Sequence, residues 1–536
     1  MIKQLKVPIW IQNLNEIINW WYLYIDKTEE IINLLQLKYV FLSRPRRFWK
    51  SLLLDTIKEL KLWNKDLFAG LYAEFNWNWE NPKPIIYLDF SSFYSSDLSD
   101  LFKDSYIIID NEYIEYYNFI NQYNINGNEL WEVIKMVNKI SNQHVTILID
   151  EYDKPIINNL INTNYNFISN YFKWFYSWIK SNDKIISNFI LTWLNRVLKM
   201  SVFSVLNNLK DISYSAYYSN IVWYTEDDLN NYFNINKDNY LKDVKSFYNG
   251  YTFWWDSNIY NPFAINLYVS EQYILKYYWT SSWLPTAIWE FINDKSQVKI
   301  LNKVLWYFIW DNKEKKSIIE SDLYLHQDII WTELYFMVLL INSWYLTLKN
   351  NKRNSLQYDI KIPNLECEIL LSKLFISTWL WQNFWSLPDI SIDAKYSLLD
   401  WLIENNVNKI NYFLIELYNN IMVYIPFDWT AKSREWYFKT FLYFQLKSMN
   451  ITNIIVEWQN DQWKLDLLFE YNNIRYLIEA KFHKWKYNES VLDDAINQWY
   501  NKYANSYLDF SKGDKILWIA WFRTDENSEF WAKFYK

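Results

Sequence analysis

The chain is poor in three residue types: its 536 residues include only four glycines, one cysteine and three histidines. A single cysteine, Cys367, excludes a disulfide within the chain and is typical of a reducing compartment. One cysteine and three histidines are too few for a conventional zinc site. No apolar run reaches the roughly 18 residues that a membrane-spanning helix needs, and the first residues lack the apolar core of a signal peptide. We therefore expect a cytoplasmic protein without membrane contacts.

An excess of positive charge is also absent. The formal net charge of -7 does not suit a protein whose whole surface coats nucleic acid, so any contact with DNA would come from local basic patches. Apolar residues make up 51% of the chain, which indicates folded cores rather than disorder. The length allows two to four domains.

The shortage of glycine is matched by an excess of tryptophan. The chain has 34 Trp and 4 Gly, together 38 of 536 residues or about 7%, which is the ordinary abundance of glycine alone. Trp254-Trp255 lies where a turn is expected between two strand-like runs, and Trp344 interrupts an apolar segment. Our hypothesis is that many tryptophans stand for glycine, because a UGA codon that some bacteria read as glycine was translated as tryptophan. Others, such as Trp279, can be genuine. The alternative is a truly tryptophan-rich protein, whose indoles would form large apolar patches.

The first third of the chain alternates strand-like and helix-like runs. The runs Tyr39–Leu42, Ile85–Phe90 and Val145–Asp150 are almost continuously apolar, which is typical of parallel strands buried on both faces. For residues 1–265 we predict an α/β fold in which helices cover both faces of a parallel sheet.

A phosphate-binding loop follows the first predicted strand. With glycine at position 49 the segment would be a P-loop that lacks only its first glycine. Its backbone N–H groups would cradle the phosphates of ATP, Lys50 would neutralise the outer phosphates, and Ser51 would bind Mg²⁺. An indole at position 49 would obstruct the phosphates and resist a positive φ. The predicted ATP-binding residues are Ser43, Arg44, Pro45, Arg46, Arg47, Phe48, Trp49, Lys50 and Ser51.

The second half of the nucleotide site is predicted where the strand Val145–Asp150 ends. Asp150 would hold Mg²⁺, and Glu151 would orient or deprotonate the attacking water. A third strand is followed by Asn195 and Arg196, and these residues or Thr192 are either sensors of the transferred phosphate or ordinary loop residues. The arginines of the loop could clamp ATP, or reach a polynucleotide or a neighbouring subunit of a homo-oligomer.

The remaining chain predicts two further domains. Residues 266–425 have a mostly helical pattern, with a hairpin of Tyr345–Leu348 and Tyr358–Ile362 after a helix, as in a winged-helix unit. Residues 426–536 predict the order αβββαβ. The expected helices are 434–447 and 489–503, and the expected strands are 453–457, 464–470, 475–481 and 515–521.

Acidic residues and a lysine on two of these strands form a candidate nuclease site. Glu479 and Lys481 share one face of their strand, and an antiparallel neighbour would bring Asp466 beside them. The two carboxylates suit Mg²⁺, which would activate water, while Lys481 would position or deprotonate the nucleophile. Gln498 could contact the phosphate or lie on a solvated helix face, and His483 is expected to be a bystander. The spacing alone is common in a chain with 61 acidic residues, so the αβββαβ order carries the prediction.

These motifs resemble the AAA-ATPase-like family that carries a C-terminal PD-(D/E)XK nuclease domain. The resemblance implies ATP and Mg²⁺ as cofactors, DNA as a partner, and Glu435 as a further catalytic residue of the nuclease site. The matching segments are Val7–Gln12, Tyr24–Thr28, Arg44–Ser51, Leu148–Asp153, Leu206–Asp211 and Tyr248–Tyr251. The family has glycine where this chain has Trp10, Trp49, Trp193, Trp254 and Trp344.

From this pattern we predict an ATP-binding and ATP-hydrolysing protein whose nucleotide state controls a Mg²⁺-dependent nuclease acting on DNA. Two alternatives remain open. In one, the protein is a nucleotide-regulated switch whose C-terminal domain only binds nucleic acid. In the other, it is a decayed mobile-element protein with neither activity.

Overall fold

The computed structural model divides into two compact units, residues 1–368 and 369–536. The described residues are 6–44, 47–80, 82–93, 98–125, 130–152, 154–157, 165–193, 208–236, 240–253, 255–279, 295–310, 317–319, 332–349, 357–380, 398, 400–422, 442–443, 446, 451, 454–456, 467–483, 515–523 and 528–534. No helix within these ranges is both long enough and apolar enough to cross a bilayer.

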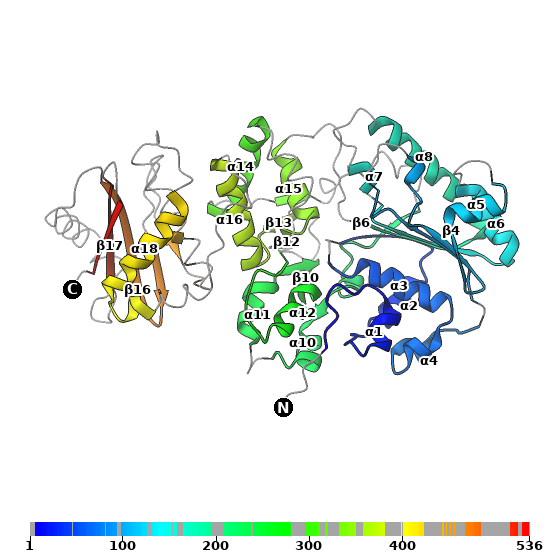
Figure 1. Ribbon diagram of the computed structural model, residues 1–536, viewed down its shortest axis with the longest axis horizontal. Helices are drawn as coiled ribbons and strands as arrows, with labels where there is room; N and C mark the ends of the chain where they lie inside the picture. Colours follow the sequence, from blue (N-terminus) through cyan, green and yellow to red (C-terminus); the bar gives the residue numbers. More distant parts are fainter. Residues whose placement is uncertain are drawn as a thin grey trace. The chain divides into compact units, whose positions relative to one another are not determined.

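A seven-stranded sheet forms the centre of the N-terminal unit (Figure 1). Its order is β4-β3-β2-β5-β6-β1-β7, and the strands from β2 to β7 in this order run parallel, while β3 and β4 form an antiparallel edge. The predicted α/β fold with a mostly parallel sheet is confirmed. The strands are β1 Tyr39–Ser43, β2 Ile85–Asp89, β3 Tyr106–Ile109, β4 Glu112–Glu115, β5 Val145–Asp150, β6 Ile186–Trp193 and β7 Lys210–Asp211.

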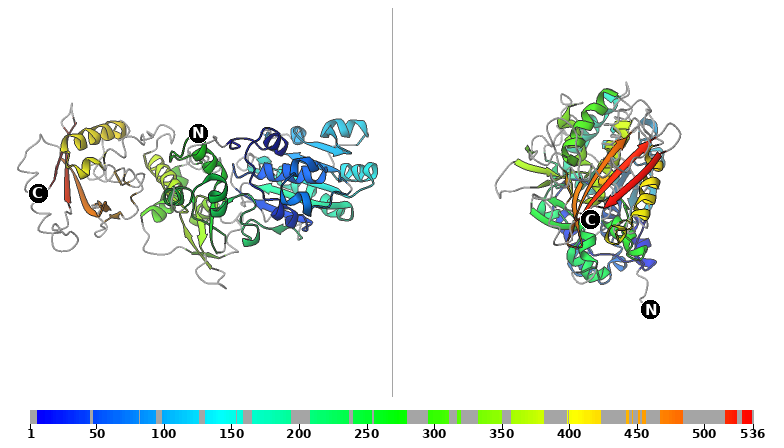
Figure 2. Two further views of the ribbon diagram at one scale, coloured as in Figure 1. Left: turned by 90° about the horizontal axis from the view of Figure 1, so that it is seen from below. Right: turned by 90° about the vertical axis from the view of Figure 1, so that its left-hand side faces the viewer.

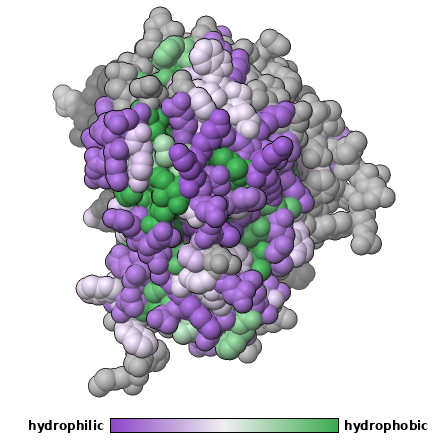
Figure 3. All heavy atoms as spheres, turned by 90° about the vertical axis from the view of Figure 1, so that its right-hand side faces the viewer, coloured by the Kyte–Doolittle hydropathy of each residue, from purple (hydrophilic) through white to green (hydrophobic). Residues whose placement is uncertain are grey.

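Helices lie on both sides of this sheet, with α3 on one side and α8 on the other (Figure 1). Every residue of β1 and β5 is buried, so the apolar runs in the sequence reflect strands covered on both faces. On the face of this unit in Figure 3, hydrophilic residues predominate and hydrophobic ones form small groups. The helices are α1 Leu14–Asn19, α2 Thr28–Leu34, α3 Lys50–Lys61, α4 Tyr72–Asn76, α5 Tyr116–Gln122, α6 Leu130–Ser141, α7 Lys154–Ile157 and α8 Tyr165–Ser181.

Two small sheets complete the N-terminal unit. The first has the order β8-β10-β9 and the second β11-β13-β12. The predicted hairpin is present as β12 and β13, which are antiparallel with Leu348 opposite Ile360. The sequence did not predict β11, which pairs with the other side of β13. The prediction that Trp255 belongs to a turn is wrong, because it is the first residue of β10 and pairs with Phe253. Position 254 alone separates β9 from β10, and it lies outside the described residues.

Helices precede and follow these strands along the chain. The strands are β8 Tyr224–Thr225, β9 Tyr251–Phe253, β10 Trp255–Tyr260, β11 Ser317–Ile319, β12 Thr347–Lys349 and β13 Gln357–Lys361. The helices are α10 Glu226–Phe233, α11 Leu241–Tyr248, α12 Pro262–Ser270, α14 Lys295–Trp310, α15 Glu333–Asn342 and α16 Leu365–Leu380.

The C-terminal unit contains a five-stranded sheet of order β14-β15-β16-β17-β18. Strands β14 to β16 are antiparallel, β17 is parallel to β16, and β18 is antiparallel to β17. Figure 2 shows the longer strands side by side, and α18 contacts β18. The predicted helix 489–503 and most of 434–447 lie outside the described residues, and β18 was not predicted. The elements are α18 Val407–Met422, β14 Ile455–Val456, β15 Leu467–Tyr471, β16 Ile474–His483, β17 Lys515–Arg523 and β18 Ser528–Phe534.

Three helices of the N-terminal unit are followed by tryptophan in the left-handed conformation. Trp21 follows α1 with φ 58°, Trp63 follows α3 with φ 66°, and Trp344 follows α15 with φ 64°. After α15, the N–H groups of Trp344 and of the next residue donate to the carbonyls of Ile341 and Leu340, both at 2.9 Å. This pair of bonds is the Schellman motif, whose left-handed residue is usually glycine because a Cβ is strained there.

Among the aromatic residues, tryptophan adopts the left-handed conformation most often. Within the described ranges, five tryptophans have a positive φ, against two tyrosines and no phenylalanine. The chain has 34 Trp, 46 Tyr and 33 Phe. If aromatic residues in general tended to have a positive φ, the three types would share these positions more evenly. The backbone therefore supports the hypothesis that these tryptophans occupy glycine positions. The five are Trp10, Trp21, Trp49, Trp63 and Trp344.

Replacement of Trp21 by glycine is expected to stabilise the protein. Its side chain is 87% exposed, so little packing is lost, and relief of the left-handed strain should contribute about 1 kcal/mol. The control is Trp174→Gly in α8, where the side chain is 68% exposed and glycine should destabilise the helix by about 1 kcal/mol. Thermal unfolding of the two variants should therefore shift in opposite directions. A fall in both midpoints would contradict the assignment.

Candidate nucleotide-binding site

The candidate site lies at the edge of the central sheet where the parallel strands end. In the sheet, β1 lies between β6 and β7. The next strand of the chain, β2, is not beside β1 but is separated from it by β6 and β5. Such a reversal of strand order leaves a crevice beyond the carboxyl ends of the strands, where α/β proteins bind ligands. Ser43 ends β1, Asp150 ends β5, and Thr192 pairs in register with Leu42.

The predicted phosphate loop connects β1 to α3. Trp49 is the N-cap residue of α3, with φ 52° and ψ 28°, and its side chain makes no capping hydrogen bond. The N–H groups at the start of a helix have no partner within the helix, so the first turn of α3 presents donors to an anion. Lys50 is buried at the start of this turn. Of the nine predicted loop residues, Pro45 and Arg46 lie outside the described residues.

The carboxylate of Asp150 joins three segments of the site. It is 4% exposed and accepts hydrogen bonds from the hydroxyls of Ser51 at 2.5 Å and of Thr192 at 2.6 Å. The loop, β5 and β6 are therefore connected through the buried carboxylate of Asp150. Ser51 and Asp150 also offer two hard oxygen atoms side by side, and Mg²⁺ usually takes one or two protein ligands and completes its shell with water and phosphate. These residues fit a nucleotide-bound Mg²⁺.

Glu151 follows Asp150 in a strained conformation. Its φ is 47°, which is uncommon for a residue with a side chain, and its N–H donates to the carboxylate of Asp150 at 3.0 Å. The side chain is partly exposed and lies 3.9 Å from the amine of Lys154. Strained residues concentrate at functional sites. The position suits a residue that acts on a water molecule beside the metal.

Asp89 is a site residue that the sequence reasoning missed. It is the last residue of β2 and pairs in register with Asp150 on the neighbouring strand β5. Burial and the negative charge of Asp150 raise the pKa of Asp89 to about 6. The sequence does show an acidic residue, Asp89, near the end of the apolar run Ile85–Phe90. That residue points to the site only when β2 and β5 are known to be neighbouring strands.

The two described arginines of the loop have different surroundings. Arg44 is fully buried, and its guanidinium donates to the carbonyls of Ser43 at 2.8 Å and of Ser213 at 2.6 Å. Arg47 is partly exposed, and its guanidinium lies 4.2 Å from the ring centre of Trp10. Arg44 therefore fastens the start of the loop to the segment after β7.

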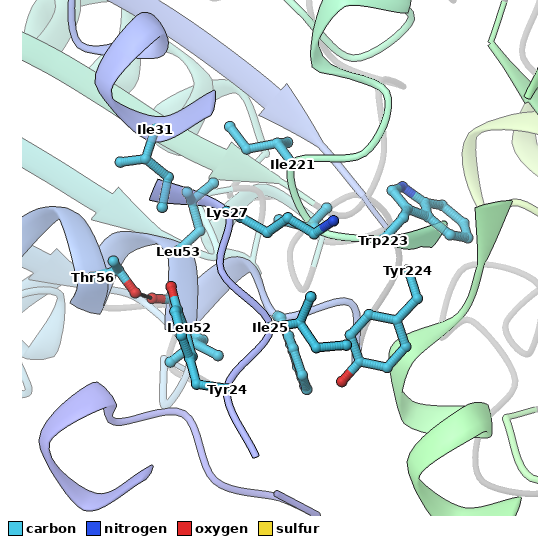
Figure 4. A pocket seen from close by; sticks show the side chains of 12 residues that line it. Tyr24, Ile25, Lys27, Ile31, Leu52, Leu53, Thr56, Ile221, Trp223 and Tyr224 are labelled. Carbon is cyan, nitrogen blue, oxygen red and sulfur yellow. Dashed lines mark hydrogen bonds between the residues drawn. The ribbon is translucent and has the colours of Figure 1, made fainter. Parts of the chain in front are cut away.

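A pocket adjoins the loop (Figure 4). Apolar and aromatic side chains line most of it, and they come from the segment before α2, from α3, and from the segment 221–224. Figure 4 shows the hydroxyls of Tyr24 and Thr56 pointing toward each other. Lys27 also lines the pocket, and its amine lies 2.8 Å from the carboxylate of Asp228. A mainly apolar pocket with a few polar groups suits a flat aromatic ring.

Residues 8–203 match the family described as "Predicted AAA-ATPase". This match contains the loop, Asp89, Asp150 and Thr192, and it indicates nucleotide binding and hydrolysis for this ATPase-like segment. The chain is also 28% identical over 487 residues to an uncharacterized protein in the vnfD 5′ region of Azotobacter chroococcum mcd 1, and the alignment covers 89% of each chain. No solved structure matches the chain.

The predicted nuclease residues lie outside the ATPase-like segment, and only two of them fall on described backbone. Glu479 and Lys481 are two residues apart in β16, opposite Trp518 and Ala520 of the parallel strand β17. Strand β15 begins directly after Asp466. The predicted residues outside the described ranges are Glu435, Asp466 and Gln498 in this domain, and Asn195 and Arg196, which follow β6 in the sequence. The nuclease site stays a prediction.

Replacement of Arg44 by lysine is expected to destabilise the protein. A single amine cannot reproduce the forked contacts of a buried guanidinium, and loss of one charged hydrogen bond costs about 2 kcal/mol. Arg47→Lys is the matched control in the same loop, and we expect its unfolding midpoint to stay close to that of the parent. Equal midpoints for the two variants would show that Arg44 does not anchor the loop.

Proposed function

We propose that residues 1–265 bind ATP and hydrolyse it at the carboxyl edge of the central sheet. The observation that carries this proposal is the buried carboxylate of Asp150, which is hydrogen-bonded to Ser51 of the loop and to Thr192 of β6. A Mg²⁺ ion at Ser51 and Asp150 would offset the charge of the outer phosphates. Lys50 would neutralise the same phosphates, and the first N–H groups of α3 would bind their oxygens.

In this proposal the base of the nucleotide occupies the pocket beside the loop. The pocket includes Leu52 and Leu53 of α3, directly after the phosphate-binding residues, so base and phosphates would contact neighbouring residues in the first turn of one helix. Tyr24 and Ile25 would form one wall and Tyr224 another. The Lys27–Asp228 ion pair at 2.8 Å connects the segment before α2 to α10 beside the pocket.

Glu151 is the residue that we propose to activate water. Water would attack the outer phosphorus, the bond to the bridging oxygen would break, and ADP and phosphate would form. Glu151 would orient the water and accept its proton. Asp89 lies beside Asp150 and adds negative charge to this edge, so its role would be to position the groups around the attacking water.

Position 49 decides whether this chemistry can occur. The indole of Trp49 lines the base pocket, 5.2 Å from the ring of Tyr224, and its backbone is left-handed. Phosphates bind such a loop through bare backbone, which a side chain at this position obstructs. We therefore propose that the functional protein has glycine here, because UGA codons in its gene are read as glycine. The positive φ of four further tryptophans supports this proposal.

Nucleotide binding should depend on the residue at position 49. We expect the protein with Trp49→Gly to bind ATP at least tenfold more tightly than the protein with tryptophan at this position, in a calorimetric titration with Mg²⁺. Lys50→Ala in the glycine-containing protein should abolish ATP turnover, because the positive charge at the outer phosphates is lost. ATP turnover that survives Lys50→Ala would instead favour the decayed-protein alternative. UGG codons at the left-handed tryptophans would contradict the glycine proposal.

We further propose that the C-terminal domain is a Mg²⁺-dependent nuclease that acts on DNA under the control of the nucleotide. The sheet supports this proposal through its antiparallel strands β14 to β16 and the parallel strand β17, which agree with the predicted αβββαβ order. Leu467, directly after Asp466, pairs with Ile478, directly before Glu479.

The nuclease proposal can be tested by plasmid nicking with the glycine-containing protein and Mg²⁺ or Mn²⁺. We expect Lys481→Ala to lower cleavage at least a hundredfold, because the residue that positions the nucleophile is removed. Lys533→Ala in β18 is the matched control and should cleave like the parent. Equal, background-level cleavage by the parent and by Lys481→Ala would favour the nucleotide-regulated switch.

A further inference from the structure

Phe48 belongs to the phosphate loop, but its side chain is buried in the protein. The ring is 0% exposed and packs edge-on against Trp279 at 5.6 Å and Tyr251 at 6.5 Å between ring centres. Both partners lie far along the chain, beyond the ATPase-like segment. Since Phe48 directly precedes Trp49 and Lys50, any change in the backbone that holds phosphate must move this ring or strain its contacts.

The same two aromatic residues are bonded to the first turn of α16. The hydroxyl of Tyr251 lies 3.4 Å from the thiol of Cys367, and the N–H of Trp279 donates to the carboxylate of Glu366 at 2.7 Å. Glu366 is 1% exposed, so this bond is shielded from water. Phe48 and α16 are thus connected through one intermediate residue on either route.

A close backbone contact fixes this junction. Gly250 has φ +91°, and a Cβ at this residue would lie 1.7 Å from the carbonyl oxygen of Pro363. The side chain of Asn364 also donates to the carbonyl of Asn249 at 2.8 Å. The chain before Tyr251 therefore cannot shift without the segment that leads into α16.

Helix α16 continues from the N-terminal unit into the C-terminal one. The division between the units falls between Glu368 and Ile369, within the helix Leu365–Leu380. A helix is a stiff element, so a displacement of its first turn also moves the turns that follow. Neither route uses one of the left-handed tryptophans, and the route through Tyr251 also does not depend on the residue at position 279.

We propose that Phe48 is a positioning residue that transmits the state of the nucleotide loop to α16 through Tyr251 and Trp279. Binding of the phosphates holds the loop in one conformation and thereby selects one position of the Phe48 ring, which biases α16. The proposal rests on nucleotide binding by the loop and adds the route by which the C-terminal unit senses it.

Hydrogen exchange of the full-length, glycine-containing protein, with and without a saturating non-hydrolysable ATP analogue and Mg²⁺, tests this route. In the parent we expect exchange to slow at least threefold both in residues 47–56 and in residues 363–380. In Phe48→Leu the response of 363–380, relative to that of α3, should fall by at least half, because the ring contacts are lost. Phe68→Leu is the control: this ring is equally buried, and both responses should remain.

A second, milder variant guards against a general loss of folding. Tyr251→Phe removes only the hydroxyl that contacts Cys367, and it should weaken the response of 363–380 while the loop stays protected. Protection of the loop without any response in 363–380 of the parent would overturn the route and leave ATP binding intact. A full response in Phe48→Leu would also overturn it. Absence of protection in the loop itself would overturn both proposals.

Discussion

The candidate nucleotide site depends on one buried carboxylate, that of Asp150, whose oxygens need hydrogen-bond partners. A charge as deeply buried as that of Asp150 is tolerated only with hydrogen bonds or ions around it, and the hydroxyls of Ser51 and Thr192 supply those bonds. Because the three residues belong to the loop, to β5 and to β6, satisfying Asp150 also fixes the relative positions of these segments. The same oxygens suit a magnesium ion, so a metal bound by Ser51 and Asp150 would replace the hydrogen bond between them.

The loop carries two structural tasks beside its proposed role with phosphate. Arg44 at its start is bonded to backbone carbonyls, and Phe48 near its end is packed among aromatic rings. Both side chains are buried in the protein, so under our proposal the backbone of the loop would contact the phosphates. A loop with a single candidate glycine position could then serve as a phosphate cradle, because buried side chains would set its shape as much as glycine would.

The elements that the sequence predicted well are those with local signals. Strands β1, β2 and β5 are continuous apolar runs, and the β12–β13 hairpin follows from two strand-like runs around a polar turn. The pocket beside the loop could not be found this way, because residues 24–31, 49–56 and 221–224 come together only in the folded chain. Asp89 could not be found either, because only the register of β2 with β5 places it beside Asp150. The burial of Arg44 was equally hidden, since one of its acceptors, the carbonyl of Ser213, lies 169 residues away in the chain.

The backbone strain of the tryptophans with positive φ cannot be explained by a functional role alone. Strain at a ligand-binding residue can be compensated by the function it serves, and Trp49 by itself would allow that explanation. Trp21 and Trp63 follow the ends of helices, and Trp21 is 87% exposed, so packing of its indole does not offset the strain at that position. Glycine removes the strain at all these positions by the same means and leaves the Schellman bonds intact. One substitution rule thus accounts for helix ends and phosphate loop together, whereas genuine tryptophan needs a separate explanation at each.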